Sequence, residues 1–131
     1  MTSYDDIYSQ FIIISKTDSF NLPSTIEGQH NAIHSGINHF NSRMRTNITY
    51  NDNTETVDKD LTNDELLILT HMMKLEFLNN DLTYTATLLQ PFEKEIGIKN
   101  LGSQLSAKSD LIKKEKQEIE QLILNQSDDY M

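Results

Sequence analysis

The segment Leu61–Leu78, LTNDELLILTHMMKLEFL, constrains this chain more than any other. Its apolar residues cover nearly every direction around a helical axis, and a helix that is apolar on most sides must be wrapped by other helices. Thr62 followed by Glu65 forms a capping box, in which each side chain satisfies an unpaired backbone N–H at the helix start. We therefore expect a central helix, carrying Leu66, Leu67, Ile68, Leu69, Met72, Met73, Leu75, Phe77 and Leu78.

A first helix is expected over Ser3–Ser15, where apolar residues from Tyr4 to Ile14 follow the three–four spacing of one helical face. Ile12 and Ile13 fall outside that stripe, so this helix has more apolar surface than one contact covers. The second contact is either another helix of the chain or a neighbouring subunit. The candidate subunit contacts are Tyr8, Phe11, Ile12 and Ile13.

A second helix is expected from a capping box at Ser24–Glu27 to about Met44, with Pro23 just before it. Its stripe of apolar residues alternates steps of four and three, which suits packing at a shallow angle against other helices. Gly28 and Gly36 lie off the stripe. Each weakens the helix, unless it permits the close approach of a neighbour.

Beyond the central helix, Asn79–Asp81 is expected to interrupt the helical pattern, with a shorter helix over Leu82–Gln90. Pro91 disfavours its continuation, and Phe92–Gly102 reads as irregular because Gly97 and Gly102 punctuate it. A last helix is expected over Ser103–Asn125, where Leu105, Ile112 and Ile119 recur every seven residues.

The polar segment Arg45–Asp60 separates the second and central helices. Its Asn, Asp and Thr side chains compete with helix by bonding to nearby backbone. Thr46–Tyr50 has the composition of a short strand and Asn51–Asn53 that of a turn, so a β-hairpin is possible here. Long loops of this kind in compact domains are usually functional or mobile.

The predicted fold class is all-α, a bundle of about four helices in one domain over residues 1–125, followed by a flexible tail over residues 126–131. A chain of 131 residues fits one domain. It has no cysteine, and its unbroken apolar runs reach only four residues, which predicts no disulfides, no thiolate chemistry and no membrane span. The start MTSYDDIYSQ predicts no signal peptide.

Four histidines and a net charge of −9 supply the candidate chemistry. His30 and His34 are four residues apart on the second helix, a spacing that can place two imidazoles on one metal. No further ligand is identified, so a partly buried His30 and a solvated His34 are favoured. His71 lacks a nucleophile partner and is expected to be satisfied at a helix–helix contact. No catalytic residue, metal or cofactor is therefore predicted.

Lys113, Lys114 and Lys116 form the only basic cluster, and acidic residues outnumber basic ones in both halves of the chain. A nucleic-acid-binding face requires more net positive charge. Because Glu115, Glu118 and Glu120 alternate with the lysines, the pattern favours a solvated helix face with intrahelical ion pairs.

The order of these features resembles the small head–tail connector, or adaptor, proteins of tailed bacteriophages that infect Gram-positive hosts. The resemblance covers most of the chain outside Arg45–Asp60. One departure is IGIKNLGSQL before the last helix, where that family often has aromatic residues. The matching residues are Tyr4-Asp5-Asp6-Ile7-Tyr8, Leu61-Thr62, Asp64-Glu65, Leu69, Met73, Leu75-Glu76-Phe77-Leu78, Leu111, Lys114, Glu118-Ile119 and Leu122-Ile123.

The resemblance implies a non-enzymatic virion protein, assembled in the host cytoplasm and located in the neck. It implies a homo-oligomeric, dodecameric ring between the portal protein and the downstream neck (stopper) or tail proteins. The ring would line the DNA channel without reading sequence. The candidate portal-binding tail is Gln126, Ser127, Asp128, Asp129, Tyr130 and Met131.

The alternative is a small acidic cytosolic helical regulator, such as an antirepressor or an antitoxin-like protein, that binds one partner without forming a ring.

Overall fold

The computed structural model describes residues 1–15, 25–89 and 98–129. These residues form four helices and a small three-stranded sheet, in the order β1 (Thr2–Ser3), α1 (Tyr4–Ser15), α2 (Ile26–Met44), β2 (Tyr50–Asn51), β3 (Thr56–Val57), α3 (Asn63–Leu89) and α5 (Ile98–Asp129). The predicted all-α bundle is confirmed, with the sheet as a minor addition.

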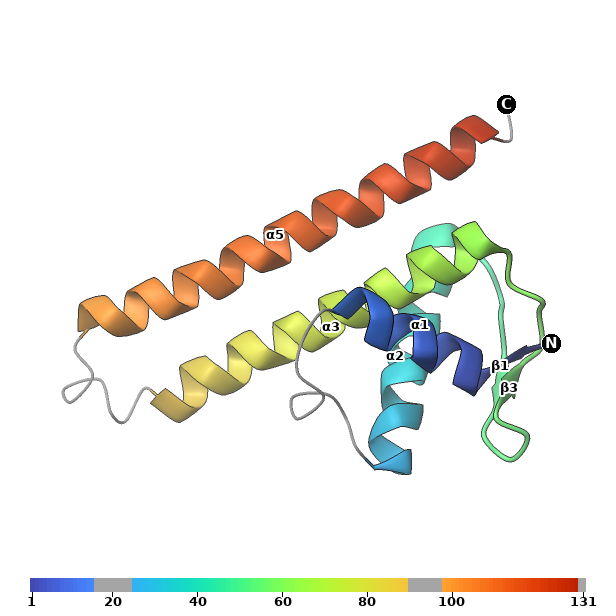
Figure 1. Cartoon of the computed structure of the whole chain (residues 1–131), viewed down its shortest axis with the longest axis horizontal. Helices are drawn as coiled ribbons and strands as arrows, with labels where there is room; N and C mark the ends of the chain where they lie inside the picture. The colour runs from blue at the N-terminus through green and yellow to red at the C-terminus, as the bar shows by residue number, and fades with distance from the viewer. Residues whose placement is uncertain (16–24, 90–97, 130–131) are drawn as a thin grey trace.

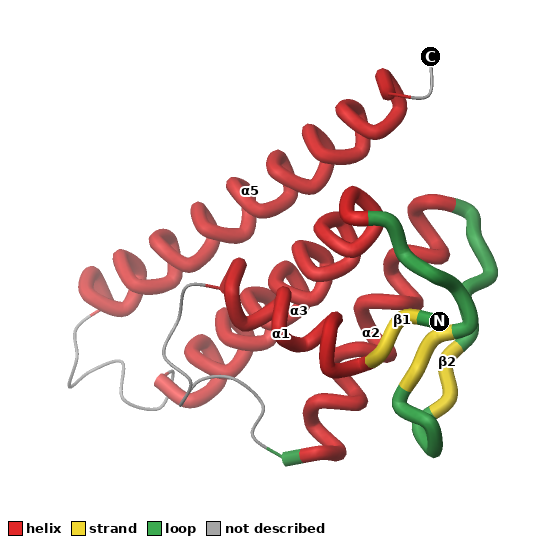
Figure 2. Tube along the Cα trace, turned by 45° about the vertical axis from the view of Figure 1, so that its right-hand side comes forward, coloured by secondary structure: helices red, strands yellow, loops and turns green. Residues whose placement is uncertain are grey.

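Helix α3 is the centre of the molecule, as its apolar sequence predicts. It packs against α1, α2 and α5. Helices α3 and α5 run antiparallel along one another, whereas α1 and α2 pack against the part of α3 nearest the sheet (Figure 1). The same long pair of helices is visible from a second direction in Figure 2.

The core lies where α1, α2 and α3 meet. Ile68, Leu69, Met72 and Met73 of α3 are almost completely buried within the chain itself. The apolar surplus of the central helix is therefore covered mainly by the chain's own helices, whereas part of the surplus on α1 stays exposed. The other fully buried large side chains of the core are Ile7, Phe11, Ile33, Ile37, Phe40 and Val57.

The capping box at the start of α3 has the predicted geometry. The Glu65 backbone N–H donates to Thr62 Oγ1 at 3.1 Å, and the Thr62 backbone N–H donates to Glu65 Oε1 at 3.1 Å. The predicted interruption at Asn79–Asp81 is wrong, because α3 continues without a break to Leu89. Asp81 is held by an ion pair with Lys108 on α5 at 2.5 Å, and packing of this kind overrides weak helix propensity.

Helix α5 is longer than predicted at both ends. It begins at Ile98 and continues to Asp129, so Gly102 lies inside the helix, and only Phe92–Gly97 of the predicted irregular segment falls outside the described residues. The long antiparallel contact with α3 supplies tertiary stabilisation that outweighs the local cost of a glycine.

Helix α2 begins one residue later than the predicted capping box implies. Thr25 is the N-cap, and its Oγ1 accepts a hydrogen bond from the Gly28 backbone N–H at 3.0 Å. Ser24 lies outside the described residues. Of the two alternatives for Gly36, close approach is correct, because Gly36 is buried where α2 crosses Leu69 and Met73 of α3.

The predicted hairpin exists, but its strands are shorter and shifted along the chain. β2 pairs antiparallel with β3, and β3 also pairs with β1 from the start of the chain, giving the order β1-β3-β2. In register, Val57 faces both Thr2 and Tyr50. Sequence periodicity gave no sign of the third strand, because a two-residue strand has no period to detect.

Candidate functional site

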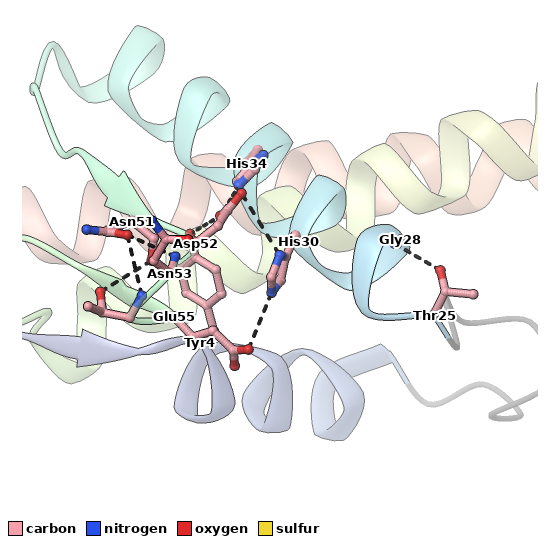
Figure 3. Close-up of polar contacts among 10 residues, drawn as sticks. Tyr4, Thr25, Gly28, His30, His34, Asn51, Asp52, Asn53 and Glu55 are labelled. Carbon is pink, nitrogen blue, oxygen red and sulfur yellow. Dashed lines mark hydrogen bonds and ion pairs between the residues drawn. The ribbon is translucent and has the colours of Figure 1, made fainter.

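A polar cluster holds the hairpin against α1 and α2 (Figure 3). At its centre, Asp52 Oδ1 accepts a hydrogen bond from Tyr4 Oη at 2.7 Å and lies 2.6 Å from His34 Nε2. The same carboxylate lies 4.0 Å from His30 Nδ1, while His30 Nε2 lies 3.8 Å from Glu55. One hairpin carboxylate therefore joins the first helix to the second.

Ring contacts strengthen this cluster. The His34 ring stacks on Tyr50 of β2 with centroids 4.0 Å apart and an interplanar angle of 14°. The Tyr4 ring meets His30 edge to face at 5.2 Å. His34 is thus enclosed between Asp52 and Tyr50, and the expectation that it is solvated is wrong. Its side chain is 21% exposed, almost the same as that of His30 at 18%.

The electrostatics of the cluster follow from these contacts. Hydrogen bonds from Tyr4 and His34 lower the pKa of Asp52, because they stabilise the charged carboxylate. Burial raises the pKa of Tyr4 far above its usual value, and its hydrogen bond to Asp52 adds to the rise. Tyr4 therefore stays protonated and serves as a permanent donor to Asp52.

Residues 1–15, 25–89 and 98–129 contain no group of three or more His, Asp or Glu side chains arranged to hold a metal ion. In the cluster, His30 and His34 both lie against hairpin carboxylates, with Asp52 within 4.0 Å of both rings and Glu55 3.8 Å from His30. The contacts of the cluster hold α1, α2 and the hairpin together, although these three segments are distant in sequence.

A second polar cluster joins α3 to α5. His71 Nδ1 lies 2.6 Å from Glu115 Oε1, and Lys74 Nζ lies 3.4 Å from Glu115 Oε2. The expected helix–helix contact of His71 is confirmed. However, the solvated face predicted for α5 is wrong at Glu115, whose side chain is only 6% exposed. Glu120 also pairs away from its own helix, with Arg43 of α2 at 2.9 Å.

The candidate subunit contacts on α1 divide into two groups. Phe11 is 1% exposed and belongs to the chain's own core, so it offers no surface to a neighbour, and Tyr8 is partly buried against Phe11. Ile12 and Ile13 are exposed, by 47% and 68% respectively. Two adjacent isoleucines in solvent are the marked apolar feature of this helix.

The candidate portal-binding segment lies at the end of α5. The helix includes Gln126 to Asp129, whereas Tyr130 and Met131 lie outside the described residues. None of the described helices is long and apolar enough to cross a bilayer.

These features define a small helical protein whose ionisable side chains brace its elements and whose first helix presents apolar side chains to solvent. The chain belongs to the YomZ prophage protein family, which matches residues 1–128. It is 41% identical over 131 residues, the full length of both chains, to the SPbeta prophage-derived uncharacterized protein YomZ of Bacillus subtilis (strain 168). No solved structure matches the chain.

Family membership makes this a prophage-derived protein, so the phage origin implied by the sequence resemblance is confirmed. The names of the family and of the relative say nothing of a head–tail connector, a portal or a DNA channel.

Proposed function

We propose that the protein is a non-enzymatic head–tail adaptor: a ring subunit that joins the portal to the next neck or tail component and lines the DNA channel. The sequence resemblance to adaptor proteins and the prophage family support this role together. The structural observation that carries it is the exposed pair Ile12 and Ile13 on α1. An apolar patch in solvent is typical of a surface that another protein covers.

The histidines fit a structural role. His71 is engaged by Glu115 between α3 and α5, and His34 by Asp52 at the hairpin. The net charge of −9 suits a channel wall, because like charge prevents tight binding of the phosphate backbone and lets DNA slide.

The test is electron microscopy of particles of the phage that encodes this chain, with the chain carrying a label that density or gold can reveal. The expected result is label at the junction between portal and tail. Label elsewhere in the virion contradicts the proposal. So does a chain absent from particles that co-purifies with a transcription factor or a toxin, the result expected of a cytosolic regulator.

The C-terminal segment is the proposed portal contact. Deleting residues 126–131 should reduce co-sedimentation with purified portal protein, while the circular dichroism spectrum stays helical. A same-length replacement of these residues by alanine, which favours helix, separates the loss of side chains from the loss of helix length. Unchanged co-sedimentation of both variants would remove the segment from the proposal.

A further inference from the structure

Two grooves flank the contact between α3 and α5, on opposite sides of it. One is bordered by α1 and contains Ile13, Lys74 and Lys114. The other is bordered by α2 and has a volume of about 460 Å³. The second, here called the α2–α5 groove, is lined by His39, Arg43, Met72, Leu75, Asn79, Lys116, Ile119 and Glu120.

The α2–α5 groove has an apolar base and a basic rim. Leu75 and Ile119 form the base, and Met72 lies completely buried beneath them. On the rim, Arg43 is paired with Glu120 at 2.9 Å, but Lys116 makes no ion pair with another described residue. The rim therefore carries a net positive charge in an otherwise acidic protein, and the aliphatic stems of Arg43 and Lys116 add apolar wall.

The outer face of α1 has the complementary character. Five residues share the exposed side of this helix, because their spacing places them all within one sector of about a third of a turn. Ile12 and Ile13 give the apolar part, and neither Asp5 nor Asp6 has an ion pair within the part of the chain that the structure describes. The face consists of Asp5, Asp6, Ser9, Ile12 and Ile13.

We propose that the outer face of α1 in one copy docks into the α2–α5 groove of a second copy. Ile12 and Ile13 would cover the apolar base and the stems, while Asp5 and Asp6 would face the basic rim. The opposite charges of the two surfaces favour a second copy of this chain over an unrelated occupant.

The placement of the two surfaces excludes a two-fold dimer built by this contact. Helix α1 lies on the near side of α3 in Figure 1 and α2 on the far side, so a copy cannot return the same contact to its partner. Such a head-to-tail contact leaves one free surface at each end, so it builds a ring where its rotation closes and an open filament where it does not. The inference rests on the proposed ring-subunit function and names the contact that would build the ring.

The test measures the mass of the purified full-length chain by sedimentation velocity across a concentration series. Wild-type protein should form species larger than a dimer. Ile13→Asp should weaken self-association by at least about tenfold, since it places a charge where the proposed contact would cover an isoleucine. The double variant His39→Asp with Lys116→Glu should do the same, because its rim repels Asp5 and Asp6.

Two controls accompany these variants. Leu124→Asp places the same charge on an exposed apolar residue of α5, which is 57% exposed and lies outside both surfaces. This variant should assemble like wild type. Circular dichroism checks that each variant keeps its helices, which is expected because Ile13, His39 and Lys116 are all exposed.

Mixing gives the decisive result. The Ile13→Asp chain keeps its groove, and the rim variant keeps its α1 face, so an equimolar mixture should form a one-to-one heterodimer and nothing larger. A wild-type chain that stays monomeric, variants that assemble normally, or a mixture that stays monomeric would each overturn the proposal.

The two proposals fail separately. Neck label in the virion with unaffected variants would contradict the docking contact alone. Assembly through this contact without neck label would contradict the adaptor role alone.

Discussion

At the scale of single residues, Gly36 decides how closely the second helix approaches the third. A Cβ atom at this position would lie 2.4 Å from Met73 Cγ and 3.3 Å from Leu69 Cδ1. Met73 is buried, and its Cγ is not the free end of the side chain, so it has little room to move. Gly102 is the useful contrast, because a Cβ there would meet nothing within 4 Å.

Replacing the two glycines with alanine should change the free energy of unfolding in opposite directions. Gly36→Ala should lower the free energy of unfolding by about 1–3 kcal/mol, the usual cost of overpacking. Gly102→Ala should raise it by up to about 1 kcal/mol, because alanine favours helix without a clash. Urea unfolding followed by circular dichroism measures both. A Gly36→Ala variant that is as stable as wild type or more stable would mean that the helix crossing is looser than described.

At the scale of elements, the sequence predicted where helices exist better than where they end. The capping box at Thr62 and Glu65 marked the start of α3 because both partners are local. The continuation through Asn79–Asp81 escaped prediction because its support, such as the pair between Asp81 and Lys108, comes from another helix.

The sequence indicated only some members of each polar cluster. His71 was expected at a helix contact, but its partner Glu115 lies 44 positions away and looks like one of several alternating charges. Asp52 was likewise hidden in a polar loop. Pairs between distant elements leave no spacing to detect, whereas caps and helical stripes do.

The Asp52 cluster makes the attachment of the hairpin dependent on pH. Because the pKa of Asp52 is lowered in the folded chain, its contribution to stability is present above the ordinary aspartate value of 3.8 and is lost as the pH falls through the folded value. Asp52→Asn should therefore lower the thermal midpoint at pH 7.

The difference from wild type should shrink steadily below pH 3.8. Thermal scans from pH 7 to pH 2.5 measure it, with Asp110→Asn on the exposed side of α5 as the control for general charge. A difference that is independent of pH would mean that the cluster works through shape and not through charge.

At the scale of the whole molecule, the contact between α3 and α5 determines whether α5 stays packed against the rest of the chain. Glu115 is the buried charge in that contact, and it holds His71 and Lys74 together. Removing one member of a buried charged group leaves the others without compensation, which usually costs more than the group contributes as a whole.

Glu115→Ala should lower the free energy of unfolding by roughly 3 kcal/mol, and Glu118→Ala, an exposed residue one turn away, by less than about 0.5 kcal/mol. Amide hydrogen exchange should show α5 losing protection before α2 does. Simultaneous loss of protection in all helices would indicate that α5 is not a separately opening unit.

The pairing of the first strand with the third also governs the order in which the chain can fold during its synthesis. Thr2 meets Val57, so about 55 residues must be made before the partner of the first strand exists. At ribosomal rates of roughly 5–20 residues per second, that is a wait of roughly three to eleven seconds. Throughout this interval Ile7 and Phe11, fully buried in the finished molecule, have no permanent cover. The N-terminal helix is thus the part of the nascent chain that stays accessible to chaperones and to aggregation during this interval.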